Sequence, residues 1–400
     1  MKHYSFLLVF VSLLLFCACG NKTDSPTLSM TSTDLSRMDR VEIKDQRKII
    51  VDSIVEKIDY VKLGETGDVL IGKVTDLLIT PDHIIVGDTR QAKAIFIFDR
   101  AGNSQAVISR LGRGPQEYVD LRTIFLTPDQ QAIGIVDNSM KKLLYFDLQG
   151  NFIKKQDLPF SCNGIEFLDD KKMMLVSDGW ADKLPALETY PNKKDLLFFT
   201  DTTLQIQSSA IVNPFDVNKF YYAPVYKKKF DDRIYVGKAF GDTIYQVTAD
   251  EIFPRYWIDM TAVDGVANFG KDASNEKIDQ ARSTFDGNLY VESDDYALFF
   301  PSKDNIMFPV LFNKNTKKSY NIDIRSQTAL GMYVLSAEFS DKNQFISVIP
   351  AFQFLTFCPD VPGVELRNEI KEGLTDEDNP VLLFYTLKDP EVVFQTVCPE

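Results

Sequence analysis

Short runs of hydrophobic residues recur along the chain and are separated by polar turn residues. A run over Val74–Ile79 leads into a Thr-Pro-Asp turn at residues 80–82, and His83–Val86 follows that turn. Two further runs, Ala94–Phe98 and Ala106–Ile108, come after short loops that contain Gly and Asp. Runs of this length and composition, bounded by turn residues, are typical of β-strands. This part of the chain therefore predicts four short antiparallel strands.

The same pattern returns one unit later in the sequence. Its markers keep their order at a spacing of 47 or 48 residues: the turn at 80–82 recurs at 127–129, Phe98-Asp99 at 146–147, and Gly102-Asn103 at 150–151. Four strands in roughly 40–50 residues are typical of one blade of a β-propeller. The repeat therefore predicts a ring of similar small sheets.

Weaker copies of the unit can be followed to the end of the chain, and we count six. The last unit lacks a fourth strand, whereas Ile58–Leu63 precedes the first blade and belongs to none. We expect this segment to supply the missing strand, because an open last blade would expose an unpaired edge. The predicted fold is an all-β, six-bladed β-propeller over residues 41–400, closed by an N-terminal strand, with short helical insertions at Lys271–Arg282 and Val364–Lys371.

The first residues have the pattern of an export signal. Lys2 precedes an apolar run over Phe6–Phe16 that is too short to span a bilayer. The following Cys-Ala-Cys resembles a bacterial lipobox, which makes residues 1–18 a lipoprotein signal peptide and Cys19 the lipidated residue. An ordinary secretory signal cleaved nearby is the alternative. Residues 19–40, rich in Ser and Thr, are predicted to be a flexible tether. We expect an outer-membrane lipoprotein of the cell envelope, on either face of that membrane.

Charge and histidine content narrow the choice of function. The chain has 44 Lys and Arg against 57 Asp and Glu, a net charge of −13, which argues against a nucleic-acid partner. It has two histidines, and His3 lies in the predicted leader. Only His83 is left, which excludes His-cluster metal sites, and the absence of Cys-x-x-Cys makes a zinc site improbable. The sequence predicts no metal site and no cofactor.

The end of the first blade carries the string Arg110-Leu-Gly-Arg-Gly-Pro-Gln-Glu-Tyr118. A Gly-x-Gly-Pro-x-Glu-Tyr string after an NHL-like blade, behind a lipoprotein signal, resembles the six-bladed β-propeller lipoprotein family of Bacteroidales. The likeness is sharpest between residues 65 and 158. The resemblance implies a fold and a cellular address, with no reaction and no catalytic residue.

Two sets of polar residues are candidate ligand groups, each with a structural alternative. Arg110 and Arg113 are placed to hold an anion between two blades, although the string around them also fits a structural crossing. Asp88, Asp137 and Asp178 occupy equivalent blade positions, where repeated carboxylates suit Ca²⁺ or a hydroxylated ligand. The alternative is that each Asp caps its own loop.

Aromatic residues suggest two further candidates. Trp180 and Tyr190 lie in a long loop, where their rings suit the flat face of a sugar; the alternative is that Trp180 plugs the loop onto hydrophobic neighbours. Residues 219–230 combine aromatic residues with three consecutive lysines, Lys227 to Lys229. In an acidic exported protein this segment predicts a strand pair with a solvated turn rather than a binding strip.

The remaining reactive groups give weak signals. Cys358 and Cys398 sit in similar strings, and an exported compartment permits a disulfide between them; two buried thiols are the alternative. Cys162 stands alone. Catalysis by His83 is disfavoured because no Gly-x-Ser-x-Gly elbow occurs.

These observations favour a lipid-anchored binding or scaffold module, whose partners are the membrane and a glycan, a peptide or another envelope protein. The alternative is a metal- or carboxylate-dependent hydrolase or lyase with its site in the central channel. Carboxylates with shifted pKa values on the channel axis would favour the enzyme.

Overall fold

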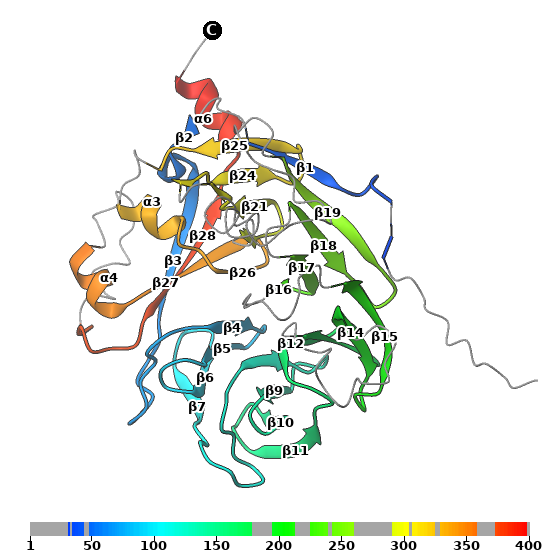
Figure 1. Ribbon diagram of the computed structural model, residues 1–400. Coiled ribbons are helices and arrows are strands. Elements are labelled where there is room, and N and C mark those ends of the chain that lie inside the picture. Colours follow the sequence, from blue (N-terminus) through cyan, green and yellow to red (C-terminus); the bar gives the residue numbers. More distant parts are fainter. Residues whose placement is uncertain are drawn as a thin grey trace, which may run out of the picture.

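The computed structural model describes residues 31–32, 34–43, 48–177, 194–212, 225–238, 242–259, 290–303, 306–324, 329–357 and 373–397. Apart from one two-stranded hairpin, their strands form six sheets arranged around a central axis (Figure 1). The predicted all-β, six-bladed propeller is confirmed. Both predicted helical insertions, Lys271–Arg282 and Val364–Lys371, lie outside the described residues.

The first three blades are four-stranded antiparallel meanders whose strands follow chain order from the axis outward. Blade 1 contains β4 (Asp76–Ile79), β5 (His83–Asp88), β6 (Ala94–Asp99) and β7 (Ser104–Ile108). Blade 2 contains β8 (Thr123–Leu126), β9 (Ala132–Asp137), β10 (Lys142–Asp147) and β11 (Phe152–Asp157). Blade 3 contains β12 (Cys162–Phe167), β13 (Lys172–Ser177), β14 (Asp195–Asp201) and β15 (Ile206–Val212).

The other three blades each include a strand from the N-terminal part of the chain. Blade 4 contains β16 (Val225–Phe230), β17 (Arg233–Lys238), β18 (Thr243–Val247), β19 (Ile252–Asp259) and β1 (Asp39–Glu42). Blade 5 contains β20 (Tyr290–Glu292), β21 (Tyr296–Phe299), β24 (Val310–Asn313), β25 (Lys318–Ile322) and β2 (Lys48–Ile49). Blade 6 contains β26 (Phe339–Asp341), β27 (Gln344–Ile349), β28 (Val381–Leu387) and β3 (Val55–Lys62).

Strand β3 closes the ring as the sequence predicts. It pairs antiparallel with β28 from Val55 to Lys62, and Tyr60 lies opposite Leu383. The chain then passes directly into blade 1. Gly102 lies where the two meet, at a φ of +89°, and a Cβ there would lie 2.1 Å from the carbonyl oxygen of Lys62. A side chain at this position would therefore push β3 away from blade 1.

Two further N-terminal strands were not predicted. Strand β1 runs parallel to β19 on the outer edge of blade 4, and β2 runs parallel to β25 on blade 5. Arg37 adds a bidentate ion pair with Glu251, with both distances 2.7 Å. The segment predicted as a tether up to residue 40 is therefore attached to blade 4 in its last part, because its backbone completes the outer edge of that sheet.

The middle strands of each blade are buried on both faces, because each sheet packs between two neighbouring sheets. All residues of β5 except His83 are buried, and so are all of β6 except Asp99. The outermost strands, such as β11 with the pattern Phe-Ile-Lys-Lys-Gln-Asp, are largely exposed. Aromatic residues fill the spaces between blades, as in the edge-to-face contact of Tyr256 in blade 4 with Phe299 in blade 5.

Short elements complete the described part of the chain. They are the 3-10 helix η1 (Val51–Ile54), the helices α3 (Ala329–Val334), α4 (Ala351–Phe357) and α6 (Pro390–Val397), and the small hairpin of β22 (Ser302–Lys303) and β23 (Ile306–Met307). Among these described elements, no helix has the length and apolar character needed to cross a bilayer.

Candidate functional site

Asp88, at the end of β5, is fully buried, and its carboxylate is hydrogen-bonded to backbone amides. It accepts hydrogen bonds of 2.8–3.1 Å from five amide groups, those of Gly72, Lys73, Arg90, Gln91 and Ala92. Burial acts to raise the pKa of Asp88, but these amides outweigh it and bring the pKa below its ordinary value. Asp88 therefore ties the entrance of blade 1 to the loop after β5.

Asp137 does the same in blade 2. Its buried carboxylate accepts hydrogen bonds from the amides of Val119 (2.9 Å), Asp120 (3.3 Å) and Met140 (3.0 Å). Local capping thus describes both residues, and neither carboxylate presents unoccupied oxygens to a ligand at the face of the ring. Asp178 lies outside the described residues.

The Arg110–Tyr118 string forms the crossing between blades 1 and 2. Tyr118 is fully buried, and its hydroxyl donates to the carbonyl of Lys93 at 2.6 Å. The amide of Gly114 donates to the carboxylate of Glu117 at 2.7 Å, which closes the tight turn. Arg110 donates to the carbonyl of Gly150 in the second blade at 3.2 Å. The structural interpretation of the string therefore accounts for Arg110, whereas Arg113 is exposed.

Several other predicted positions lie outside the described residues. They are Cys19, Trp180, Tyr190, Cys358 and Cys398. Cys162 is described and lies buried at the start of β12.

Charged residues converge on the central channel. Glu166, on the innermost strand of blade 3, is buried and lies 2.5 Å from the ammonium of Lys227 and 2.9 Å from that of Lys229, both on the innermost strand of blade 4. Burial acts to raise the pKa of Glu166, but the two ammonium groups hold it below its ordinary value. The predicted strand pair with a solvated turn is present, since β16 pairs with β17 through the exposed turn at Asp231 and Asp232. Lys227 and Lys229 lie in the strand before that turn and are paired with a carboxylate at the channel.

A second carboxylate lies on the innermost strand of blade 1. Asp76 accepts hydrogen bonds from the hydroxyls of Thr123 in blade 2 (2.8 Å) and Thr75 (2.9 Å). Its side chain keeps partial solvent exposure although protein surrounds it, as expected for a residue on a channel wall. Burial raises the pKa of Asp76. Burial lowers the pKa of Lys228, which is influenced from across the channel by Glu338 and Asp76.

A cavity of about 270 Å³ opens at one end of this channel. Its wall combines residues from the innermost strands of five blades or from the turns that follow them. The apolar part includes Leu77, Ile79, Leu126, Phe167 and Leu168; the charged part is Lys229, Asp169, Asp231, Asp232 and Asp341. Only a closed ring can bring these strand ends together, so the cavity is a consequence of the propeller fold.

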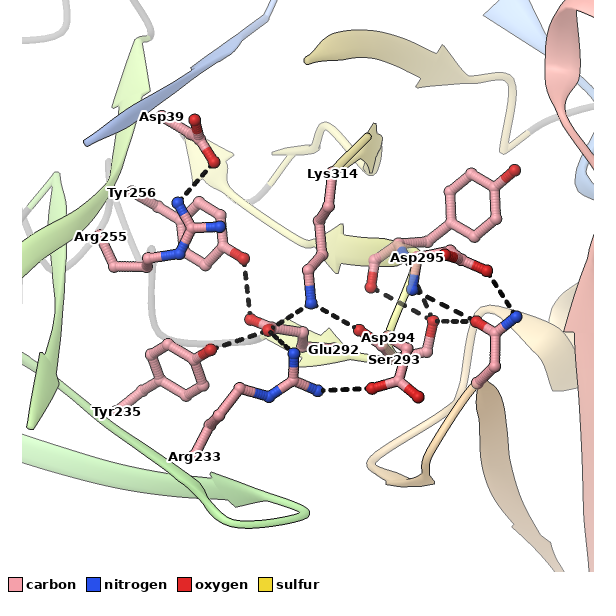
Figure 2. A network of polar contacts seen from close by, with 12 residues as sticks. Asp39, Arg233, Tyr235, Arg255, Tyr256, Glu292, Ser293, Asp294, Asp295 and Lys314 are labelled. Atoms are coloured by element: carbon pink, nitrogen blue, oxygen red, sulfur yellow. Dashed lines mark hydrogen bonds and ion pairs between the residues drawn. The ribbon is translucent and has the colours of Figure 1, made fainter. Parts of the chain in front are cut away.

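Blades 4 and 5 are joined by a buried polar network beside the channel (Figure 2). The carboxylate of Glu292 accepts hydrogen bonds from the hydroxyls of Tyr235 (2.8 Å) and Tyr256 (3.0 Å) and from the ammonium of Lys314 (2.7 Å). Arg233 lies 3.4 Å from the same carboxylate. Burial raises the pKa of both tyrosines and lowers that of Lys314. Because Glu292 is fully enclosed, we interpret this network as a connection between blades.

Asp39 extends the connection to the outer edge of the ring. Its carboxylate, on β1, lies 2.5 Å from Arg255 of blade 4 and 2.8 Å from Lys317 of blade 5. The N-terminal strand thus fastens both blades. Within the described ranges, no three His, Cys, Asp or Glu side chains form a metal-ligand set.

Sequence reasoning missed Glu166, Asp76 and the acidic turn at Asp231. A lone Glu or Asp in a β-rich segment gives no signal that distinguishes an innermost strand from an outer one. Three consecutive lysines on an apolar background were a usable signal. It predicts a charged channel once the segment is assigned to the innermost strand of its blade.

Comparison with known families agrees with this architecture. The sequence profile of a domain of unknown function, DUF4934, matches residues 37–386. The chain belongs to the DUF4934 family. The matched region begins just before β1 and ends in β28, so it includes the N-terminal strands and the closure of the ring. No curated protein shows a significant match to this DUF4934 sequence.

Solved structures share the fold at low sequence identity. A candidate exported protein from Bacteroides fragilis NCTC 9343 superimposes with a TM-score of 0.67 at 19% identity, over 88% of this chain and all of the other. A DUF4221 family member from Bacteroides vulgatus ATCC 8482 gives a TM-score of 0.48 at 13% identity, over 86% of this chain and 99% of the other. The first likeness supports the propeller fold alone.

Proposed function

We propose that this protein is a lipid-anchored binding module of the bacterial cell envelope that holds a ligand in the cavity at the end of its central channel. The cavity is the observation that carries the proposal. It is concave, it combines partly exposed apolar side chains with a few charged groups, and it lies on the axis of the ring, as ligand sites often do. Envelope placement rests on the leader-like first residues and on the export named for the Bacteroides fragilis protein of the same fold.

A substitution that fills the cavity tests the binding proposal. Leu126 contributes a partly exposed side chain to the wall, so Leu126→Trp would occupy the space without adding charge. We expect the full-length protein in detergent to bind members of glycan or peptide arrays, and Leu126→Trp to lose that binding. Ile153→Trp, which adds the same ring to the exposed outer strand of blade 2, is the matched control and should retain it.

The arrays also distinguish binding in the cavity from binding at Trp180, in the predicted aromatic loop. Binding that Trp180→Ala abolishes and Leu126→Trp leaves intact would move the site to that loop and overturn the proposal. Silence of the wild-type protein on both arrays would count against any glycan or peptide role.

The lipid anchor has its own test. Cys19→Ala should release the protein from membranes and abolish incorporation of a radiolabelled fatty acid, whereas Cys17→Ala should do neither. Persistent labelling of Cys19→Ala would contradict the proposed anchor at that residue.

A carboxylate-dependent hydrolase or lyase is the second candidate, favoured by the pair Asp76 and Lys228. Burial raises the pKa of the carboxyl group and lowers that of the amine, as is common for groups that exchange protons in catalysis. Turnover of envelope glycans or esters that Asp76→Asn abolishes would support this reaction. Turnover that survives the change would exclude Asp76 from it.

A further inference from the structure

The charges that line the axial cavity do not balance. Among the described residues of its wall, Lys229 is the single cation, against Asp169, Asp231, Asp232 and Asp341. Lys229 already has a partner in Glu166, at 2.9 Å, which it shares with Lys227. A ligand entering this space therefore meets an excess of negative charge.

Two of the four carboxylates have partners in the protein. Asp341 accepts a hydrogen bond from Arg100 at 2.6 Å. Asp169 accepts from the amides of Lys171 and Lys172 at 2.8 and 2.6 Å, and so caps its own turn. These two residues shape the cavity and keep little capacity for a ligand.

Asp231 and Asp232 differ from them. Both are exposed in the turn between β16 and β17, and neither carboxylate has a hydrogen bond or ion pair to a residue in the described part of the chain. Partial burial raises the pKa of Asp231, and the negative charges of Asp232, Asp294 and Asp341 raise it further against the opposing effect of Arg233. A cation placed between the two carboxylates would relieve this repulsion.

The rest of the wall specifies what should carry that cation. Leu77, Ile79 and Leu126 are partly exposed and form an apolar surface next to the carboxylates. A chain of methylene groups ending in an ammonium or guanidinium group matches both surfaces, because such side chains pack their stems on apolar atoms and keep the charge at the polar end. A volume of about 270 Å³ suits one such side chain.

A sugar ring fits this wall less well. Stacking of a sugar needs an unobstructed aromatic face, and Phe167 is the single aromatic residue in the part of the lining that the structure describes. Its ring already packs on Phe125 with the ring centres 5.9 Å apart.

We propose that the axial cavity binds a lysine or arginine side chain of a partner peptide, with its aliphatic stem on Leu77, Ile79 and Leu126 and its charge between Asp231 and Asp232. This inference rests on the proposed binding function and names the ligand class for the same cavity. The geometry places the specificity in the β16–β17 turn and the contact area in the ends of β4 and β8.

The test compares blocked pentapeptides of glycine with a central lysine, arginine or acetyl-lysine, measured by calorimetry on the full-length protein in detergent. Lysine and arginine peptides should bind, and acetylation should weaken binding at least tenfold, because it removes the charge and keeps the stem. The double variant Asp231→Asn/Asp232→Asn should weaken lysine-peptide binding by about tenfold, which is 1.4 kcal/mol. The double variant Asp157→Asn/Asp250→Asn removes the same charge from exposed positions outside the cavity and should leave binding unchanged.

The outcomes separate this inference from the broader function. Equal binding of lysine and acetyl-lysine peptides, lost in Leu126→Trp, would overturn the cationic ligand and keep the cavity as a binding site. If Leu126→Trp abolishes the binding of no array member and of no peptide, both the cationic ligand and the cavity as a binding site are overturned. If the two double variants weaken peptide binding equally, the effect comes from the overall charge of the protein, which would contradict the assignment to Asp231 and Asp232.

Discussion

The ammonium group of Lys229 lies 2.9 Å from the carboxylate of Glu166, although the two residues belong to different blades. Lys227 completes the arrangement from the same strand. One carboxylate thus joins the innermost strands of blades 3 and 4. Glutamine, the neutral isostere of Glu166, would leave two ammonium groups without a counter-ion.

We expect Glu166→Gln to lower the free energy of unfolding by about 3 kcal/mol, because it removes one partner of a buried ionic cluster. Chemical denaturation followed by tryptophan fluorescence measures the loss. Asp157→Asn, which breaks the exposed Lys155–Asp157 pair, should change stability by less than about 0.5 kcal/mol. Equal stability of Glu166→Gln and wild type would show that the cluster does not hold the two blades together.

The same cluster makes stability depend on pH in the acid range. The pKa of Glu166 is lowered in the folded protein, whereas an unfolded chain has the ordinary value of about 4.3. A group of this kind contributes its stability fully above the unfolded pKa and loses it as pH falls through the folded pKa. We expect the melting temperature to decrease below about pH 4.3, and to decrease less steeply in Glu166→Gln. Parallel curves for the two proteins would assign acid sensitivity to other carboxyl groups, such as Asp88.

The adjacent residue Lys228 should behave in the opposite way. Burial lowers its pKa, and it has no ion pair with a residue of the described ranges, so its charge opposes folding. We expect Lys228→Met to be neutral or stabilising by up to about 1 kcal/mol at pH 7, because an apolar side chain of similar volume avoids the cost of burying charge. Lys227→Met should destabilise. A large loss of stability in Lys228→Met would mean that Asp76 and Glu338 depend on its charge.

Tyr118 connects the crossing between the first two blades through its hydroxyl. Tyr118→Phe should cost about 1–2 kcal/mol, because it leaves the carbonyl of Lys93 without its 2.6 Å hydrogen bond. The buried Tyr145 has no hydroxyl hydrogen bond within the described residues, and Tyr145→Phe is therefore the matched control. Equal effects of the two changes would remove the structural explanation for the Gly-x-Gly-Pro-x-Glu-Tyr string.

The repeat in the sequence was sufficient to predict the fold, because each blade must bury both faces of its middle strands and repeats the same turns. The 48-residue spacing from Phe98 to Phe146 predicted repeated blades. Because Ile58–Leu63 belongs to no blade of its own, it predicted the strand that closes the ring. Strands β1 and β2 were not predictable in this way. Asp39–Glu42 has too few residues and too many charges for a strand signal, and its pairing depends on an edge that exists only once blade 4 has folded.

The candidate site was less accessible to prediction. The equivalent positions of Asp88 and Asp137 and their capping of the loop that follows were recognised, but these carboxylates also bind amides that lie 15 to 18 residues earlier in the chain. The cavity combines strand ends from five blades, so its lining residues are scattered from Leu77 to Asp341. Local sequence patterns do not show which of these strand ends bring charged residues close to one another.

Closure of the ring by β3 is the claim on which the channel and its cavity depend. Lys57 and Thr386 lie opposite each other on β3 and β28, within reach of a disulfide for paired antiparallel positions. We expect Lys57→Cys/Thr386→Cys to form an intramolecular disulfide under mild oxidation and to raise the melting temperature, whereas neither single variant should do so. Two thiols that stay reduced in the folded protein would contradict the closed propeller.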